Sequence, residues 1–221
     1  MAVSSRFYDE MHAGDNRLRP AYKAFADWLH ARPAEELAQK RAEADWLFRR
    51  VGITFAVYGD KEGSERLIPF DQIPRIIPAS EWEFVELGLR QRALALNAFL
   101  HDIYHEQHIL RSGLIPPEQV LTNQDYQLAM QGITLPNRMY SHVAGIDLVR
   151  DGSGDYFVLE DNLRTPSGVS YMLENRKMMM RLSPELFDMH AVAPVEHYPD
   201  LLLDTLRASA PMGVLDPVVV V

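Results

Sequence analysis

Apolar and polar residues alternate with two different periods along the chain, and the period changes at identifiable points. Near the N-terminus the apolar positions follow helical spacing, which predicts one helix over residues 19–32 and a second over residues 34–51 that stops at Gly52. A longer helix is expected to begin at Ser80 and to continue to about residue 110. Helical spacing returns in three later segments, residues 123–133, 169–182 and 198–209.

Two other parts of the chain have the β-branched and aromatic composition of strands. The first, "ITFAVYG" at residues 53–59, is expected to pair with the short segment "RLIPF" at residues 66–70. The second consists of residues 139–150 and 155–162 joined by "DGSG", and it has the strongest hairpin pattern in the chain. The final "PVVVV" reads as the first strand of a buried parallel sheet. Together these elements predict an α+β fold with an antiparallel β-hairpin and several packed helices.

The second hairpin ends in a cluster of polar side chains. If its turn contains four residues, Asp147 pairs with Val158. Because side chains alternate faces along a strand, Asp147, Glu160 and Asn162 are expected on one face and Asp161 on the other. A turn that is longer or shorter by one residue would move Asp147 to the opposite face.

Two carboxylates and one amide on a shared face suit a hard divalent cation such as Mg²⁺ or Mn²⁺. Asp147 and Glu160, on a diagonal of about 7 Å, would repel by about 2 kcal/mol at a dielectric of about 20. A cation or the side chain of Arg164 is therefore expected beside them. The alternative is a solvated strand end that makes one Arg–Asp contact.

The composition narrows the class of protein. Apolar residues make up 47% of the 221 residues, which is enough for a packed core. The net charge of −9 gives no general attraction to nucleic acid or to an anionic membrane, so a bound nucleotide would need a bridging cation. The chain has no cysteine, which excludes disulfides, thiolate metal sites and a cysteine nucleophile. We find no targeting segment and no run of about 18 apolar residues, so a cytoplasmic protein is expected.

Other groups of side chains each have two interpretations. His101, His105 and His108 share one helix face, which fits either a metal site or a solvated polar face. "DGSGD" at residues 151–155 resembles the start of a calcium loop but lacks the later glycine and glutamate, so a hairpin turn is favoured. The methionines of the helix over residues 169–182 are expected to fill the core rather than to bind a soft metal.

Three further polar groups are candidates for substrate contacts. The polar side chains of residues 8–12 fit either a substrate-side role or a solvated terminus. Residues 174–176, in the helix after the hairpin, fit either the edge of an active site or ordinary packing. Arg75 lies in a proline-rich crossing loop, where a structural role is favoured over contact with an anionic substrate.

Several long segments, taken together, resemble one known family. They occur in the family's order and extend from about residue 7 to the last residue: "FYDEMH", "GITFAVYGD", "ERLIPFDQIPRIIPASEW", "LNAFLHDIYHEQHIL" and "HVAGIDLVRDGSGDYFVLEDNLRTPSGVSYMLENR". They resemble the circularly permuted ATP-grasp type 2 family, which is similar to the ATP-grasp synthetase part of glutathionylspermidine synthase. The resemblance implies an ATP-grasp-like lobe.

The resemblance also implies an activity and a set of site residues. Members of this family join a carboxylate to an amine through an acyl phosphate at the expense of ATP, with small-molecule or peptide substrates. In the family, Mg²⁺ bridges the ATP phosphates to an acid on one strand and a Glu-x-Asn on the next, which correspond to Asp147, Glu160 and Asn162. The loop after the Glu-x-Asn handles the carboxylate substrate or the transferred phosphate, and three residues here are the catalytic candidates: Arg164, Thr165 and Ser167.

The sequence departs from the family's pattern at two places. Related synthetases carry an arginine two residues before the strand aspartate, where this chain has Gly145, so the positive charge is expected from Arg150 or Arg164. Family members also continue past residue 221. Residues 1–210 are therefore expected to be the N-terminal part of a permuted ATP-grasp domain, and residues 211–221 the start of a Rossmann-like domain that is otherwise missing. Such a truncated chain would lack the lysines that hold the nucleotide.

Three functional hypotheses follow. The first is a truncated ATP-grasp ligase that uses ATP and Mg²⁺ or Mn²⁺. The second is a non-catalytic module that acts through protein contacts, with self-association through an exposed C-terminal strand. The third is a metal-free hydrolase that uses Asp147 and Glu160 as acid and base. Under all three, neither nucleic acid nor membrane is an expected partner.

Overall fold

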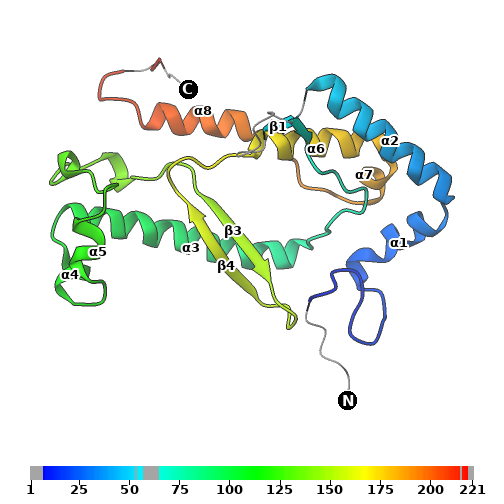
Figure 1. Ribbon diagram of the computed structural model, residues 1–221, viewed down its shortest axis with the longest axis horizontal. Helices are drawn as coiled ribbons and strands as arrows, with labels where there is room; N and C mark the ends of the chain where they lie inside the picture. The colour runs from blue at the N-terminus through cyan, green and yellow to red at the C-terminus, as the bar shows by residue number, and fades with distance from the viewer. Residues whose placement is uncertain (1–6, 53, 57–64, 215, 219–221) are drawn as a thin grey trace. The chain divides into compact units, whose positions relative to one another are not determined.

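The computed structural model describes residues 7–52, 54–56, 65–214 and 216–218. It combines helices with two small antiparallel sheets, which confirms the α+β class (Figure 1). None of the helices in these ranges is long and apolar enough to cross a membrane. The α-helices are α1 (Lys23–His30), α2 (Ala34–Val51), α3 (Ala79–Tyr104), α4 (His108–Arg111), α5 (Pro117–Leu121), α6 (Val169–Leu182), α7 (Glu185–Met189) and α8 (Tyr198–Ala208). The strands are β1 (Thr54–Ala56), β2 (Glu65–Leu67), β3 (Gly145–Arg150) and β4 (Tyr156–Asn162), and the 3-10 helices are η1 (Pro20–Tyr22), η2 (Leu128–Met130) and η3 (Pro136–Arg138).

Most helices form where the apolar spacing predicts them. The helix predicted over residues 19–32 is present as η1 followed by α1, and α6 has the predicted bounds. Helix α2 ends at Gly52, which has a φ of 74° and donates its N–H to the carbonyls of Arg49 and Phe48. Glycine adopts this left-handed conformation without the steric cost that a side chain would add, so it is a favourable helix stop.

Helix α3 differs from the prediction at both ends. It begins at Ala79, one residue before Ser80, and it ends at Tyr104 instead of about residue 110. The Asp102 carboxylate accepts hydrogen bonds from the backbone N–H groups of His108 and Ile109, both at 2.9 Å. These bonds start the separate helix α4, and the intervening Gln107 has a φ of 56°, which breaks the helical path.

The helix predicted over residues 123–133 is wrong. Only the short η2 forms there, because a local side-chain bond competes with helical hydrogen bonding: Asn123 Oδ1 accepts the N–H of Asp125 at 2.9 Å. The ring of Tyr126 instead stacks on Tyr104, with centroids 4.9 Å apart. Aromatic packing against α3 therefore decides the path of this segment.

Two of the expected strand regions, residues 53–70 and residues 217–221, are described only in part. β1 and β2 pair antiparallel as expected, but the turn expected between them falls largely on residues 57–64, which lie outside the described residues. Of the final "PVVVV", the described residues 217–218 do not form a strand, and Val218 is 94% exposed. The proposed division at residue 210 and the self-association through this end stay predictions.

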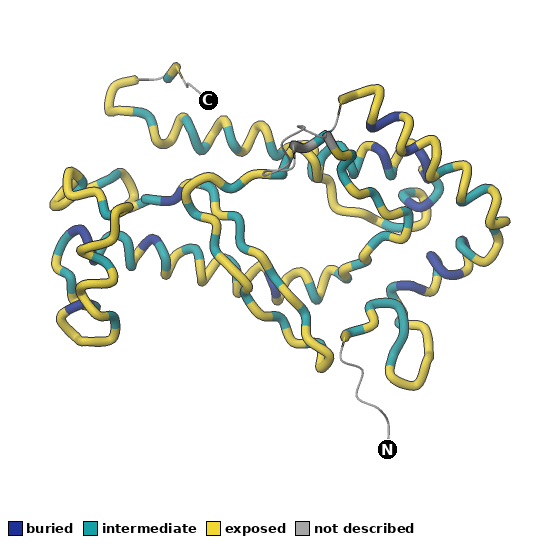
Figure 2. Tube along the Cα trace, in the orientation of Figure 1, coloured by how far each residue is buried: buried dark blue, intermediate teal, exposed yellow. Residues whose placement is uncertain are grey.

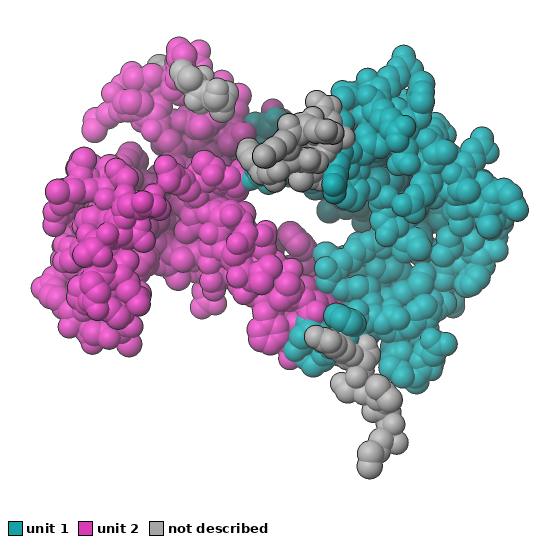
Figure 3. All heavy atoms as spheres, viewed as in Figure 1, with its two compact units in different colours: residues 1–78, 151–154, 167–199 teal, residues 79–150, 155–166, 200–221 magenta. Residues whose placement is uncertain are grey.

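The chain forms two compact units (Figure 3). Unit 1 consists of residues 1–78, 151–154 and 167–199, and unit 2 consists of residues 79–150, 155–166 and 200–221. The chain therefore passes between the units several times, including on both sides of the turn that joins β3 to β4.

Unit 1 has two apolar clusters that bury its helices. One joins α2 to α6 through Phe48 and Met178, and the other joins α1 to α7 through Phe25 and Leu186 (Figure 2). The expectation that the α6 methionines fill the core is confirmed for Met178 and is wrong in part, because the side chains of two others are exposed by 40% and 49%: Met172 and Met180. Met179 is half-buried and packs against the cluster of Phe25 and Leu186, so two of the four methionines of α6 contribute to the core.

Unit 2 is built on α3, which packs against the β3–β4 hairpin and against an aromatic cluster. The cluster surrounds the C-terminal turn of α3, where Ile103, Tyr104 and Leu110 are buried. Further back on α3, the buried Asn97 binds the segment that leads into β3: its Oδ1 accepts the N–H of Tyr140 at 2.7 Å and of Ser141 at 2.9 Å. The hairpin is therefore held by α3 along its length.

Candidate metal and nucleotide site

The β3–β4 hairpin has a different register from the one expected. Arg150 pairs with Tyr156, so the turn contains five residues, 151–155, instead of four. A regular continuation of this ladder would turn Asp147 and Glu160 to opposite faces. The five-residue turn by itself would therefore have separated the two carboxylates.

A β-bulge between Asp147 and Leu148 compensates for the longer turn. Leu148 pairs with Val158, whereas Asp147 pairs with Glu160, so Leu159 is the extra residue on β4. The expected pairing of Asp147 with Val158 is wrong, but Asp147 and Glu160 still share a face. They oppose each other directly, a position in which Cβ atoms are about 5 Å apart.

The three candidate ligands lie on the exposed face of the hairpin. Asp147, Glu160 and Asn162 are all exposed, and Asn162 Nδ2 donates a hydrogen bond to Glu160 Oε1 at 3.1 Å. The amide thus orients the carboxylate that faces Asp147. Two carboxylates and an amide oxygen are hard donors, and this set fits a magnesium or manganese ion.

Apolar side chains continue the same face toward the turn. Val149 pairs with Phe157, and these two side chains are exposed by 42% and 53%, while Leu159 at the bulge is exposed by 68%. An acidic end and an apolar end on one strand pair suit a ligand that has both a charged and an apolar part.

The missing arginine at Gly145 has a structural reason. A Cβ atom there would lie 3.0 Å from the Cβ of Pro166 and 3.4 Å from that of Asn162, so the loop after β4 leaves little room for a side chain. Arg150 does not supply the charge on this face, since it forms an ion pair with Glu81 of α3. Of the two expected replacements, that leaves Arg164.

The three catalytic candidates of the loop after β4 do not form one described cluster. Arg164 Nη1 contacts Asp125 Oδ1 at 3.2 Å, and both side chains are largely exposed. Thr165 is also exposed and belongs to unit 2, whereas Ser167 belongs to unit 1, next to the start of α6. The catalytic roles of these residues stay predictions.

The opposite face of the hairpin has polar partners on α3 that the sequence pattern did not indicate. Asp161 points away from the candidate ligands, as expected, and both of its oxygens are bound by Arg92 at 2.7 and 2.6 Å. These hydrogen bonds lower the pKa of Asp161 even though burial opposes the shift. Arg150 and Tyr156 meet Glu81 on the same side. An acid at an inward strand position requires a cation, and this signal could have pointed to α3.

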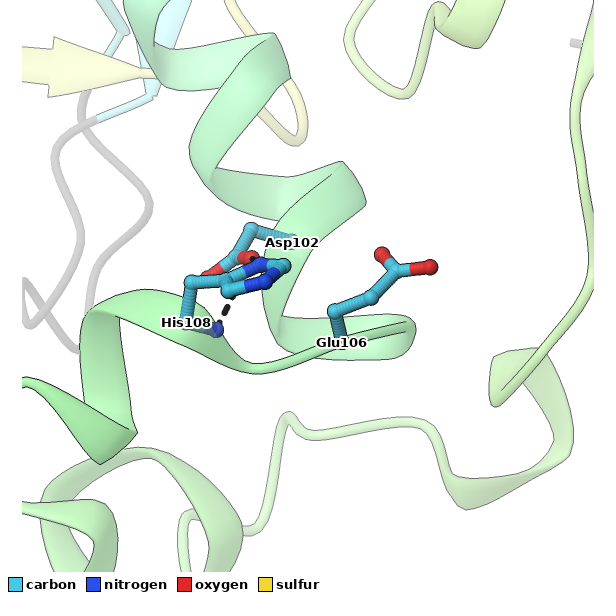
Figure 4. A group of neighbouring side chains, drawn as sticks. All are labelled: Asp102, Glu106 and His108. Carbon is cyan, nitrogen blue, oxygen red and sulfur yellow. Dashed lines mark hydrogen bonds and ion pairs between the residues drawn. The ribbon is translucent and has the colours of Figure 1, made fainter.

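His101, in α3, and the two histidines that follow that helix do not converge on one metal position in the described chain. The rings of His101 and His105 lie against each other with centroids 4.1 Å apart, and His101 Nδ1 lies 3.2 Å from the Tyr140 hydroxyl. His108 instead joins Asp102, whose Oδ1 lies 3.0 Å from its Nδ1 (Figure 4).

Asp102, Glu106 and His108 place one ligand atom each within 4.8 Å of one another. Asp102 also accepts the backbone N–H groups that start α4, and these bonds explain its position without a metal.

The remaining candidates serve as local structure in the described chain. Asp151 Oδ1 accepts the N–H groups of Ser153 and Gly154, which is the bonding of a turn and supports the hairpin over a calcium loop. The polar residues near the N-terminus make defined contacts: Asp9 accepts the backbone N–H groups of Met11 and His12, and Glu10 forms an ion pair with Arg75. In α6, the side chain of Arg176 binds the carbonyl of Ala193, and Glu174 contacts Lys177.

Known proteins resemble this chain over nearly its whole length. It is 44% identical to an uncharacterised protein of Synechocystis sp. over 97% of this chain and 45% of that protein. It is 46% identical to an uncharacterised protein of Mycobacterium tuberculosis over 99% of this chain and 39% of that protein. A Frankia alni protein named "Putative glutamate--cysteine ligase 2-3" is 39% identical over 94% of this chain and 24% of that protein. The chain thus spans less than half the length of each of these relatives.

The family comparison covers the part of the chain that contains the hairpin. The model described as "A circularly permuted ATPgrasp" matches residues 74–221, which include α3, both strands and the loop after β4. The resemblance that the sequence segments indicated is thereby confirmed, and the chain belongs to the circularly permuted ATP-grasp family.

Proposed function

We propose that Asp147, Glu160 and Asn162 bind the Mg²⁺ or Mn²⁺ ion of a bound ATP, in a protein that joins a carboxylate to an amine. The observation that carries the proposal is the bulged pairing, which sets Asp147 directly across from Glu160 on an exposed strand face. Two carboxylates at this separation repel each other in the absence of a cation. A divalent ion relieves the repulsion and bridges an acidic protein to a polyphosphate.

The apolar end of the same face supports a nucleotide as the ligand. Val149 and Phe157 pair across the two strands and are both exposed. They lie two pairs along the ladder from Asp147 and Glu160, on the same face of the hairpin. An aromatic ring and a branched aliphatic side chain form a suitable surface for a planar base. We therefore assign the acidic end to the phosphates and the apolar end to the base.

The proposed reaction has two steps. A carboxylate oxygen of the first substrate attacks the γ-phosphorus of ATP, and ADP leaves with the electrons of the broken bond. The amine nitrogen of the second substrate then attacks the carbonyl carbon of the acyl phosphate, phosphate leaves, and the nitrogen loses a proton. A divalent ion held by Asp147, Glu160 and Asn162 would neutralise phosphate charge in this reaction.

Arg164 is the proposed contact for the anionic groups on the substrate side. Its guanidinium is largely exposed and its described partner, Asp125, is also exposed, so an anionic substrate group can replace that carboxylate at little cost. The name of the Frankia alni relative suggests an amino-acid carboxylate and an amino-acid amine as the substrate class. Thr165 and Ser167 are proposed to bind the same substrate or the transferred phosphate.

Titration of Mn²⁺ and of Mg-ATP into the 221-residue chain tests the proposal. The expected result is binding that weakens about 10-fold or more in Glu160→Gln and in Asp147→Asn, because each loses a hard anionic ligand. Glu83→Gln removes an exposed acid of α3 and is the matched control. Equal affinity of Glu160→Gln and the unmodified chain would show that the metal assignment is wrong.

Activity without divalent ions and the titration of Mg-ATP separate the other two hypotheses. A metal-free hydrolase would keep its activity after complete removal of divalent ions, whereas the proposed ligase would lose all ATP turnover. A non-catalytic module would show no binding of Mg-ATP by the unmodified chain.

A further inference from the structure

The hairpin face opposite the metal ligands is attached to α3 by two polar contacts. Near the turn, Glu81 Oε1 accepts hydrogen bonds from Arg150 Nη1 at 2.9 Å and from the Tyr156 hydroxyl. Farther along, the Arg92 guanidinium binds both oxygens of Asp161. All five residues belong to unit 2, in which the two strands cross α3 at an angle (Figure 1). The contacts lie on either side of the bulge.

The bulge decides which face Asp161 occupies. Tyr156 pairs with Arg150 and Asp161 with Ile146, so five steps on β4 lie opposite four steps on β3, and the extra residue is taken up as a local bend. In a regular ladder without the bulge, Asp161 would pair with Gly145 and point to the face opposite Arg92. The contact between Arg92 and Asp161 therefore exists only in the bulged register.

Asp161 stands between two of the proposed ligands. Because neighbouring side chains on a strand point to opposite faces, a carboxylate fixed toward α3 sets the direction of Glu160 and Asn162 away from it. The bulge interrupts the ladder just before this point, so backbone pairing alone specifies the register weakly there. The Arg92 guanidinium binds both oxygens of Asp161, and this bidentate contact fixes the register that the backbone pairing leaves open.

The geometry points to Arg92 as a positioning residue for the metal site: through Asp161 it holds the register past the bulge and keeps Glu160 opposite Asp147. For its effect on metal binding, this inference rests on the proposed function. The register itself does not depend on any metal. The Arg92 side chain is 42% exposed but that of Asp161 only 17%, so loss of Arg92 leaves a partly buried carboxylate without its cation. Loss of Arg92 is expected to lower the stability of unit 2 without unfolding it, and a pairing of Asp147 with Leu159, which turns Asp161 toward solvent, becomes accessible.

Disulfide trapping reads the register directly, and the absence of native cysteine makes it free of background. The pair Asp147→Cys and Glu160→Cys reports the bulged register, and the pair Asp147→Cys and Leu159→Cys reports the regular one. In the Arg92→Met background, the first pair is expected to oxidise more slowly and the second faster. Arg90→Met, two residues away and exposed, is the control and should change neither rate. Unchanged rates in Arg92→Met would overturn the inference.

Metal affinity gives the second readout. In the chain without added cysteines, Arg92→Met is expected to weaken Mn²⁺ binding about 10-fold or more, with circular dichroism showing an equal folded fraction. The exchanged pair Arg92→Asp with Asp161→Arg should restore much of the affinity, and equal affinity in Arg92→Met and the unmodified chain would contradict the inference. If the unmodified chain binds no Mn²⁺ while trapping still depends on Arg92, the proposed function fails and the positioning role stands.

Discussion

Asn97 offers a direct test of how α3 holds the hairpin. It is 8% exposed, and its Oδ1 accepts the backbone N–H groups of Tyr140 and Ser141 at 2.7 and 2.9 Å. Ser141 in turn donates from Oγ to the carbonyl of Leu163, at the end of β4. One amide side chain therefore connects the helix to the segments on both sides of the proposed metal site.

Replacing Asn97 with alanine leaves those two N–H groups without an acceptor. A buried donor that loses its partner costs about 1–3 kcal/mol. Ser141 is buried, whereas Tyr140 is half-buried. The N–H of Tyr140 can therefore regain some hydration, and the loss of its acceptor costs about 1 kcal/mol, the lower limit of that range. Alanine is the better helix former by about 0.5 kcal/mol, which offsets part of the loss. The expected destabilisation is about 2–3 kcal/mol.

Urea unfolding of Asn97→Ala, followed by far-ultraviolet circular dichroism, measures this difference. Gln91→Ala, at an exposed position of the same helix, should stay within about 0.5 kcal/mol of the unmodified chain. Hydrogen exchange at Tyr140 and Ser141 should accelerate in Asn97→Ala alone. A loss no larger than that of the Gln91 variant, with unchanged exchange at both amides, would refute the reasoning.

Three further predictions concern unit 1. Phe48→Ala, at a side chain 1% exposed, should lower the unfolding free energy by about 3–5 kcal/mol in urea, and a loss under about 1 kcal/mol would contradict the packing. Gly154→Ala should lower the melting temperature, because φ is +98° and a Cβ would lie 2.8 Å from the ring of Tyr8; Tyr8→Ala should remove part of that loss, and an equal loss in both backgrounds would count against the contact. Burial alone would raise the pKa of Glu185, but hydrogen bonds, including one from Arg32, lower it overall. Its stabilisation is therefore present above the ordinary glutamate pKa and lost as the pH falls through the lowered one. Urea titrations should show Glu185→Gln less stable at neutral pH, with a gap that closes in acid; a constant gap would contradict this.

The parts of the fold that local periodicity determines could be predicted from the sequence. Helix α6 has its predicted bounds because the residues on either side of it are not helical. Gly168 has a left-handed conformation before the helix, and Ser183 has a non-helical conformation after it. The separation of Asp161 from Glu160 and Asn162 follows from the period of two alone.

The parts that failed depend on contacts between residues distant in sequence or on competing local bonds. The predicted helix over residues 123–133 was lost to the Asn123 side-chain bond and to stacking on α3. The partners of the hairpin's inner face, Glu81 and Arg92, are each 69 positions from a residue that they bind, and no spacing rule links them. The bulge was missed because the sequence does not show which strand carries the extra residue.

The extra residue on β4 has a consequence for how the hairpin could change in length. A strand with one residue more than its partner can form two ladders, and only the bulged one brings Asp147 and Glu160 together. Removing Leu159 would abolish the competing ladder, and the regular ladder that remains would keep Asp147 opposite Glu160 and Asp161 on the side of α3. The five-residue turn therefore sets the register next to Arg150, and the single residue Leu159 shifts that register so that the two acids meet.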